Sequence, residues 1–289
     1  STAKRETLTT DGDPAACKVS PEDKTAPPGC AALLRVETMP LVDAPLSLPP
    51  TSRPTTNSAV AGMVLVPAGD FQMGSEAGGN DARPVHRVHL DAYYIDRTEV
   101  TVAAYRSCVS AGTCTEPELG SLYNWGQSGR DSHPINGVVW SQASAYCRWA
   151  SKRLPTEAEW EKAARGTDGR MYPWGNAEAS CHYAIMDDGG HGCGHDLSWP
   201  VGSKPAGSSP YGAADMSGNV LEWVADWYDK AYYAASPGRN PRGPAIGTWR
   251  ALRSSSWTEG ADGHQSARRS SGDPSRTSQL IGFRCARDL

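Results

Sequence analysis

The chain has 289 residues, a formal charge of −4 at pH 7 and 21% charged residues. This length allows one large domain with an extension or two small domains, and the mild acidity argues against a nucleic-acid partner. No apolar run approaches the ~20 residues of a membrane-spanning helix. Ten Trp and eleven Tyr accompany 30 Gly and 22 Pro, a composition typical of loop-rich cores and wet binding surfaces.

Residues 1–59 differ in composition from the rest and hold nine of the 22 prolines. Such a stretch rarely packs a core, so we expect an extended arm, followed by a domain over 60–289. The arm would be held by its own domain, by a local disulfide or by a neighbouring copy. Because the chain starts at Ser1 with no visible signal peptide, we expect that one was removed and that the protein is exported to the periplasm, cell surface or medium.

Eight cysteines, none of them in a Cys-x-x-Cys pair, favour disulfides in an oxidising compartment over a zinc or redox site. Pairing by locality would join Cys17 to Cys30, Cys108 to Cys114 and Cys181 to Cys193, and would leave Cys147 and Cys285 far apart in the chain. Other pairings are allowed, so locality alone does not establish this set.

The first predicted elements are strands. Residues 63–74 read as a strand, a Pro-Gly turn and a second strand, and residues 89–95 read as another strand. A helix capped by Thr101 should run through 109, and a second helix should run over about 141–151.

Thr156 and Glu159 form a predicted capping box for a third helix, which should end at Gly166. Beyond it we expect loops, short strands and one short helix near 219–227. These elements predict an α+β domain with little regular structure.

Several short motifs follow one another along residues 60–289. They include a strand pair at 64–75, Glu99-Val100-Thr101, Lys152-Arg153-Leu154-Pro155-Thr156-Glu157-Ala158-Glu159-Trp160-Glu161, Tyr172-Pro173-Trp174-Gly175-Asn176, Asp215-Met216-Ser217-Gly218-Asn219-Val220, Glu222-Trp223 and Gly282-Phe283-Arg284-Cys285. Together they resemble the formylglycine-generating enzyme, or sulfatase-modifying factor, family. The resemblance implies that family's opening hairpin, its C-type-lectin-like, loop-rich α+β fold stapled by disulfides, and a bridge between Cys147 and Cys285.

The same resemblance implies a catalytic centre that this chain lacks. The family's enzymes oxidise a substrate cysteine to formylglycine with Cu(I) held by two thiolates, and soft Cu(I) prefers such ligands. The matching positions here are Glu259 and His264, and no cysteine lies between Cys193 and Cys285. A Trp that the family places beside its oxygen pocket is Leu221 here. We therefore expect no copper and no formylglycine-generating activity.

Glu259 and His264 are the candidate catalytic residues that remain. A carboxylate and an imidazole can act as an acid–base pair or bind a divalent metal, but two ligands alone make a poor metal site. The simpler interpretation is that both are polar residues of an open groove, whose predicted lining is Trp223, Ser256, Trp257, Glu259, His264 and Arg268.

One calcium site is also implied by the resemblance. Asp215 and Glu222 would supply carboxylates, and Gly218 and Val220 would supply carbonyl oxygens, the hard ligands that Ca²⁺ prefers. The alternative is that both carboxylates only cap the turn. A second family site would be damaged, with Ile185-Met186 at its centre and Asp187 and Asp188 beside it.

The remaining histidines have simpler interpretations. His182, His191 and His195 lie between or beside Cys181 and Cys193, and we expect a stapled surface loop rather than a zinc or iron site. One of His86 and His89 is expected to be packed and the other exposed, with His86 structural, and Lys152-Arg153 is expected to make hydrogen bonds at the edge of the core.

Two classes of function follow. In the first, the protein is a pseudoenzyme, a binding or structural module whose groove holds a protein or peptide, a glycan or another copy of itself in an assembly. In the second, it is an enzyme of changed chemistry, metal-dependent or acid–base, at Glu259 and His264.

Overall fold

The computed structural model describes residues 60–289. The predicted Pro-rich arm and the Cys17–Cys30 disulfide lie outside these residues. The helices are α1 (Val102–Ser110), α2 (Trp140–Trp149), α3 (Glu157–Arg165) and one irregular turn, α4 (His191–Gly194), with 3-10 turns at Asn80–Ala82, Pro205–Gly207, Tyr232–Ala235 and Ala261–Gly263. The strands are β1 (Met63–Val66), β2 (Gly69–Met73), β3 (His86–Leu90), β4 (Tyr93–Asp96), β5 (Leu221–Trp227), β6 (Arg250–Arg253), β7 (Ser270–Gly272), β8 (Ile281–Gly282) and β9 (Ala286–Asp288).

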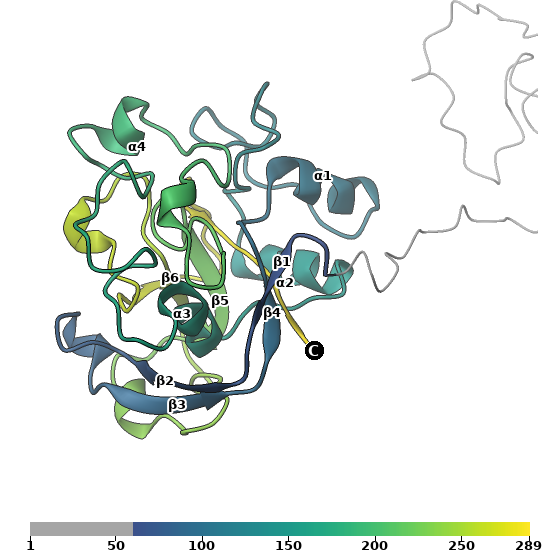
Figure 1. Cartoon of the computed structure of the whole chain (residues 1–289). Coiled ribbons are helices and arrows are strands. Elements are labelled where there is room, and N and C mark those ends of the chain that lie inside the picture. The colour runs from purple at the N-terminus through teal and green to yellow at the C-terminus, as the bar shows by residue number, and fades with distance from the viewer. Residues whose placement is uncertain (1–59) are drawn as a thin grey trace, which may run out of the picture. The chain divides into compact units, whose positions relative to one another are not determined.

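The strands form three small sheets around α3 (Figure 1). One sheet has the order β1-β4-β9, the second is the β2–β3 hairpin, and the third has the order β7-β6-β5-β8, in which only β5 and β8 are parallel. Figure 1 shows β2 and β3 at the opposite end of the domain from α4. The expected mixture of short helices, short strands and long loops is confirmed.

Three predicted elements differ from the structure. Strands β1 and β2 follow each other but do not pair, because β1 pairs with β4 and β2 pairs with β3. The single strand expected over 89–95 is divided between β3 and β4. The helix expected near 219–227 is the seven-residue strand β5, whose edges are occupied by β6 and β8. Sheet pairing with these distant segments overrides the weak local signal for a helix.

Helix α3 begins and ends as its local sequence predicts. The Thr156 hydroxyl accepts a hydrogen bond from Glu159 N, and the Glu159 carboxylate accepts one from Thr156 N at 2.8 Å. Gly166 ends the helix with a φ of 69°, a conformation that suits glycine. Helix α1 is likewise capped by Thr101, which accepts from Ala104 N. These contacts span three or four residues and are therefore visible in the sequence.

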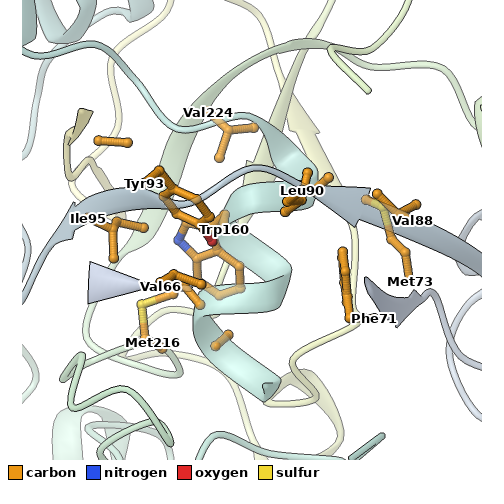
Figure 2. Close-up of a cluster of buried hydrophobic side chains, with 14 of the residues drawn as sticks. Val66, Phe71, Met73, Val88, Leu90, Tyr93, Ile95, Trp160, Met216 and Val224 are labelled. Carbon is orange, nitrogen blue, oxygen red and sulfur yellow. The ribbon is translucent and has the colours of Figure 1, made fainter. Parts of the chain in front are cut away.

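Trp160 of α3 stands at the centre of the first hydrophobic core (Figure 2). It is fully buried and packs among side chains of β2, β3 and β4 together with Met216 and Val224. Burying an aromatic side chain stabilises a domain by roughly 2–3 kcal/mol relative to leaving it in water. The Trp160 indole N–H also donates to the Glu222 carboxylate at 2.8 Å. The 152–161 motif therefore supplies the central side chain of the first core.

Charged side chains of α3 are also buried. Glu157 and Glu161 both accept from Arg253 of β6, which is fully buried, at 3.1 and 2.9 Å. Arg269 donates to Glu157 at 2.7 Å and lies over the ring of Tyr233. These two glutamates and two arginines are thus paired with opposite charges, as the low dielectric of an interior requires.

A second core lies between α1, α2 and the C-terminal segment. It contains the disulfide from Cys147 on α2 to Cys285, which joins residues 138 positions apart in the chain, and Phe283. Trp223 belongs to this core as well: its side chain is fully buried and donates to Val138 O at 3.1 Å. The prediction that Trp223 lines an open groove is therefore wrong, because β5 turns this side chain inward.

The described cysteines form three disulfides, Cys108–Cys114, Cys147–Cys285 and Cys181–Cys193. All three match the expected pairs, and each closes between segments that the fold places side by side. Within residues 60–289, no helix has the length and apolar character needed to cross a bilayer.

Candidate functional site

The segment after β6 carries the candidate residues. It runs through Trp257, turns at Ala261–Gly263 and returns through His264. The backbone of this loop is bonded to the rest of the domain at both sides. Trp257 N donates to Asn219 O at 3.0 Å, and Gly192 N donates to Trp257 O at 2.7 Å. The loop is thus clamped between the predicted calcium loop and α4.

His264 is buried inside this loop and is 1% exposed. Its Nε2 lies 3.1 Å from Glu259 O, a carbonyl that only accepts, so Nε2 carries the proton. Its Nδ1 then accepts from the hydroxyl of Ser255 at 2.8 Å. Burial lowers the pKa of His264, which keeps the ring neutral. Both ring nitrogens are satisfied by the protein itself.

Two further bonds close the network around this imidazole. Gly218 N donates to Ser255 Oγ at 2.9 Å, and the Ser217 hydroxyl donates to His264 O at 2.9 Å. The histidine therefore connects the loop after β6 to the 215–222 loop. This arrangement is that of a structural cross-link, and a buried ring of this kind has no access to a substrate.

The side chain of Glu259 points away from His264 toward Arg268. The two charges lie 2.7 Å apart, and Glu259 also accepts from Ser256 N at 3.1 Å. Because only the backbone oxygen of Glu259 meets His264, the two predicted catalytic side chains do not form an acid–base pair. Glu259 and Arg268 instead line an open hollow of about 370 Å³ with the 3-10 turn between them.

The six predicted groove residues are not brought together. Trp223, Ser256 and His264 are buried in the domain, and only Glu259 and Arg268 share a hollow. Trp257 lines a different cavity on the other side of the loop. A single groove with all six side chains was therefore an incorrect expectation, since three of them point into the protein interior.

The cavity at Trp257 is small, about 70 Å³, and polar. Asn124 lies in it, with its side-chain amide held by Pro134 O and Ser198 Oγ at 2.8 and 2.9 Å. Leu122 stands at its rim with 58% of its surface exposed.

A neighbouring hollow of about 290 Å³, lined by Trp199 among others, shares Arg130 and Leu197 with the Trp257 cavity. We call the two hollows together the Trp257 groove, defined by Leu122, Asn124, Arg130, Leu197, Trp199 and Trp257. Sequence reasoning found only Trp257 of this set, because the others come from loops without a recognisable motif.

The histidines of the disulfide-closed loop have separate neighbours. His191 lies 3.0 Å from the Asp187 carboxylate, His195 packs edge-on against Trp199, and His182 packs against Tyr183. Among residues 60–289, no cluster of three His, Cys, Asp or Glu side chains is arranged to hold a metal ion. This arrangement agrees with a stapled surface loop.

Glu222, a predicted calcium ligand, is fully buried and already paired. Both of its oxygens accept from Arg284 at 2.7 Å, and one also accepts from Trp160. A bidentate pair of this kind is a strong charge-assisted contact. Glu222 therefore keeps little capacity for a further ligand, whereas Asp215, the other predicted carboxylate, accepts from Gly202 N at 2.5 Å.

Glu99 adds a third buried carboxylate that the sequence did not indicate as a ligand. Its Oε1 accepts from Asn219 Nδ2 at 3.1 Å, and its buried Oε2 has no partner among the described residues. Burial, and then the charge of Asp215, raises the pKa of Glu99 well above its usual range. Burial likewise raises the pKa of Asp215. Three carboxylates thus share one guanidinium, that of Arg284, and an additional positive charge would stabilise them.

Comparison with known proteins assigns the chain to a family. Residues 49–289 match the sulfatase-modifying factor enzyme 1-like domain. The formylglycine-generating enzyme of Streptomyces coelicolor is 35% identical, over 83% of this chain and 92% of that protein. The hercynine oxygenase of Mycolicibacterium smegmatis is 32% identical, over 86% of this chain and 66% of that protein. The chain belongs to the sulfatase-modifying factor family.

A solved structure agrees with this assignment. PvdO from Pseudomonas aeruginosa superposes with a TM-score of 0.68 at 26% identity, covering 78% of this chain and 94% of PvdO. The loop-rich, C-type-lectin-like α+β fold expected from the resemblance is confirmed. The relatives include enzymes, so membership of the family does not by itself decide whether this chain catalyses a reaction.

Proposed function

We propose that this protein is an exported binding module that uses the Trp257 groove to hold a polypeptide and does not generate formylglycine. The observation that supports the lack of formylglycine-generating activity is the state of the two residues at the copper-ligand positions. Glu259 is paired with Arg268, and His264 is buried in a closed hydrogen-bond network. The two positions that the resemblance assigns to copper thiolates are thus used to hold the loop in place.

Residues 60–289 contain no free cysteine thiol that could replace the missing copper ligands. All six cysteines of residues 60–289 are joined in three disulfides. A disulfide sulfur is no longer a thiolate, and thiolates are what bind Cu(I) and attack a substrate. The three bridges also support an oxidising environment, as expected for an exported protein.

The chemistry of the Trp257 groove supports a polypeptide ligand. The groove combines exposed apolar side chains, Leu122 and the half-buried Leu197 and Trp199, with the charge of Arg130 and the amide of Asn124. Apolar anchors beside a few polar groups are typical of peptide and protein recognition. Acid–base catalysis at Glu259 and His264 is the weaker alternative, because their side chains do not meet.

One experiment tests the missing activity. The protein is incubated with Cu(I) and a Cys-x-Pro-x-Arg peptide, and the peptide is analysed by mass spectrometry. We expect unchanged peptide, while the Streptomyces coelicolor enzyme serves as the positive control. Formation of the aldehyde would overturn the proposal.

A second experiment tests the binding site. A displayed library of random peptides is selected on the whole protein, and enriched peptides are titrated. Binding should weaken roughly tenfold or more in Leu122→Asp and Arg130→Glu variants and stay unchanged in Arg276→Ala, an exposed control residue outside the groove lining. Polypeptide binding would be contradicted if no peptide is enriched, or if the enriched peptides bind the two groove variants as tightly as the wild type. A glycan-array ligand whose binding is lost in the two groove variants would also contradict it.

We also propose that Ca²⁺ is a structural ligand of the 215–222 loop. Asp215 and Glu99 would supply carboxylate oxygens, and the carbonyls of Gly218 and Val220 would complete a hard-oxygen set. The unpartnered Glu99 Oε2 and the raised pKa values of Glu99 and Asp215 support the need for a cation there. Glu222 would not bind the ion itself and would contribute to the site by holding Arg284 in place. The ion would neutralise buried charge and hold the loop against β5.

A further inference from the structure

A further cavity shares no lining residue with the Trp257 groove. It has a volume of about 600 Å³ and is bounded by α2, the turn between β3 and β4, the loop at 240–242 and the end of β9. In Figure 1, β9 ends at the label C, on the opposite side of the domain from α4. Volumes of 300–1,000 Å³ are typical of small-molecule sites. The cavity is thus large enough for a ligand and separate from the groove.

Apolar and polar side chains contribute about equally to the lining of this cavity, and the apolar ones include three buried residues and an aromatic ring. Leu90, Tyr93 and Leu154 are buried side chains at its base, and the half-buried ring of Trp140 forms one side. The opposite face of the Trp140 ring system is fixed by contact with Arg250, whose guanidinium lies 3.7 Å from the ring centroid. A rigid aromatic wall of this kind suits the apolar body of a ligand.

The side-chain carboxylates that line the cavity, those of Asp91, Glu159 and Asp288, are already paired. Glu159 accepts from Arg153 at 2.7 Å through both of its oxygens, and Asp288 accepts from Arg153 Nε at 3.0 Å. Asp91 is bonded to Arg239 and, at 2.7 Å, to Asn240 Nδ2. Hydrogen bonds from Arg153 hold the pKa of the Asp288 carboxyl below its usual range, so Asp288 stays ionised and bound to Arg153.

Two guanidinium groups at the mouth of the cavity lack such partners. Arg148, on α2, donates to the hydroxyl of Ser144 at 2.6 Å, and Arg242 lies on the facing loop. Within residues 60–289, neither has a carboxylate at salt-bridge distance, although Arg242 is near enough to Asp288 to contribute to the lowering of its pKa. Both side chains are exposed at the rim. The mouth of the cavity therefore carries positive charge that no acidic side chain of residues 60–289 pairs at salt-bridge distance.

We propose that this cavity binds a small organic anion, with its apolar body against Trp140 and Leu90 and its acidic group between Arg148 and Arg242. A carboxylate, sulfonate or phosphate would receive charge-assisted hydrogen bonds from guanidinium donors on two different segments. The proposal does not depend on what occupies the Trp257 groove.

The test uses a defined pair of fluorescent probes on the whole protein. The first is anilinonaphthalene sulfonate, which carries an acidic group on an apolar body, and the second is phenylnaphthylamine, which has the same rings without the charge. We expect the sulfonate to bind at one site per chain. The Arg148→Ala/Arg242→Ala double variant should weaken its binding roughly tenfold or more. The uncharged probe should bind more weakly and should not respond to this change.

Three variants separate the cavity from the rest of the surface. Ser144→Trp should block the mouth and abolish sulfonate binding, whereas Arg276→Ala and the groove variant Arg130→Ala should leave it unchanged. These are exposed or half-exposed positions, so thermal unfolding should confirm that the Tm moves by no more than about 2 °C. The proposal is overturned if the sulfonate binds the Arg148→Ala/Arg242→Ala and Ser144→Trp variants as tightly as the wild type. It is also overturned if Arg130→Ala is the change that removes sulfonate binding.

Discussion

The Oγ of Ser255 lies 2.8 Å from Nδ1 of His264. Ser255 stands just after β6 and His264 stands nine residues further on, so this bond closes the loop on itself. The same loop occupies the place where the family resemblance predicts copper ligands. Its interior is filled by a neutral imidazole and hydroxyl groups, and this explains how a domain of this fold keeps the loop rigid without thiolates.

We predict that His264→Asn destabilises the domain at neutral pH by about 1–3 kcal/mol, the cost of leaving buried groups without partners. Burial lowers the pKa of His264 in the folded state, so the unfolded chain takes up its proton first as the pH falls below about 6.5. The stabilisation due to His264 is therefore present at higher pH and declines on acidification.

Urea unfolding of wild-type and His264→Asn protein between pH 7.5 and 5 checks this sign. The difference in free energy of unfolding between the two proteins should shrink as the pH falls. A difference that grows on acidification would show that the folded state prefers the charged ring. His133, whose pKa burial lowers to about 4, stays in both proteins and so cancels in the comparison.

Arg284→Met should be among the most damaging single changes, at about 3–5 kcal/mol, because it leaves the buried Glu222 carboxylate without its cation. The Glu222→Gln/Arg284→Met double variant should lose clearly less than the sum of the two single changes, since neither partner then remains as a lone buried charge. A double-mutant cycle in urea gives the coupling, and simple additivity would contradict the pairing.

The Cys147–Cys285 disulfide, which closes a long loop, should contribute more to stability than the Cys108–Cys114 disulfide, which closes a short one. Replacing Cys147 and Cys285 by Ser opens a loop with a sequence separation of 138, which the chain-entropy model values at about 5 kcal/mol. The same change at Cys108 and Cys114, with a separation of 6, should cost about 2 kcal/mol. Unfolding free energies of the two double-Ser variants test this order, and the reverse order would mean that local contacts dominate.

Calcium should raise the thermal stability of the protein if Asp215 and Glu99 hold it. At about a hundredfold excess over the Kd, binding adds about 2.7 kcal/mol, which corresponds to a rise in Tm of roughly 5–10 °C. Calorimetry with Ca²⁺ and with EGTA measures the difference. The Glu99→Gln variant should lose most of it, whereas the Asp273→Asn surface variant should keep it. A wild-type Tm that is the same in both buffers rules the site out.

Local contacts explain which parts of the fold were predictable. Thr101 caps α1 and Thr156 with Glu159 caps α3 through bonds that span three residues. The locally paired disulfides also follow from short separations, 6 and 12 residues. Strand β5 was missed because its conformation depends on Arg253 and Ile281, which are paired with it from distant segments.

The site was less predictable than the fold because a sequence motif specifies which residues are present but not where their side chains point. Trp257 lines a cavity other than the groove that the sequence predicted, and its neighbours there, Asn124 and Arg130, come from a loop with no motif. The motif that contains Glu222 and Trp223 does not reveal that one side chain meets Arg284 and the other enters the second core. Glu99 belongs to the Glu99-Val100-Thr101 motif, but the motif did not indicate a role as a ligand, since that role depends on the proximity of Glu99 to Asp215.

By itself, the sequence determined the family, the helix ends and the lack of a free thiolate pair at 259 and 264, because these depend on residue identity and short-range spacing. Only the tertiary structure decided that His264 is a buried cross-link, that Glu259 belongs to Arg268, and that Arg148 and Arg242 face the same cavity. Such partnerships join segments up to a hundred residues apart, and they exist only when the chain has buried its core and brought those segments together.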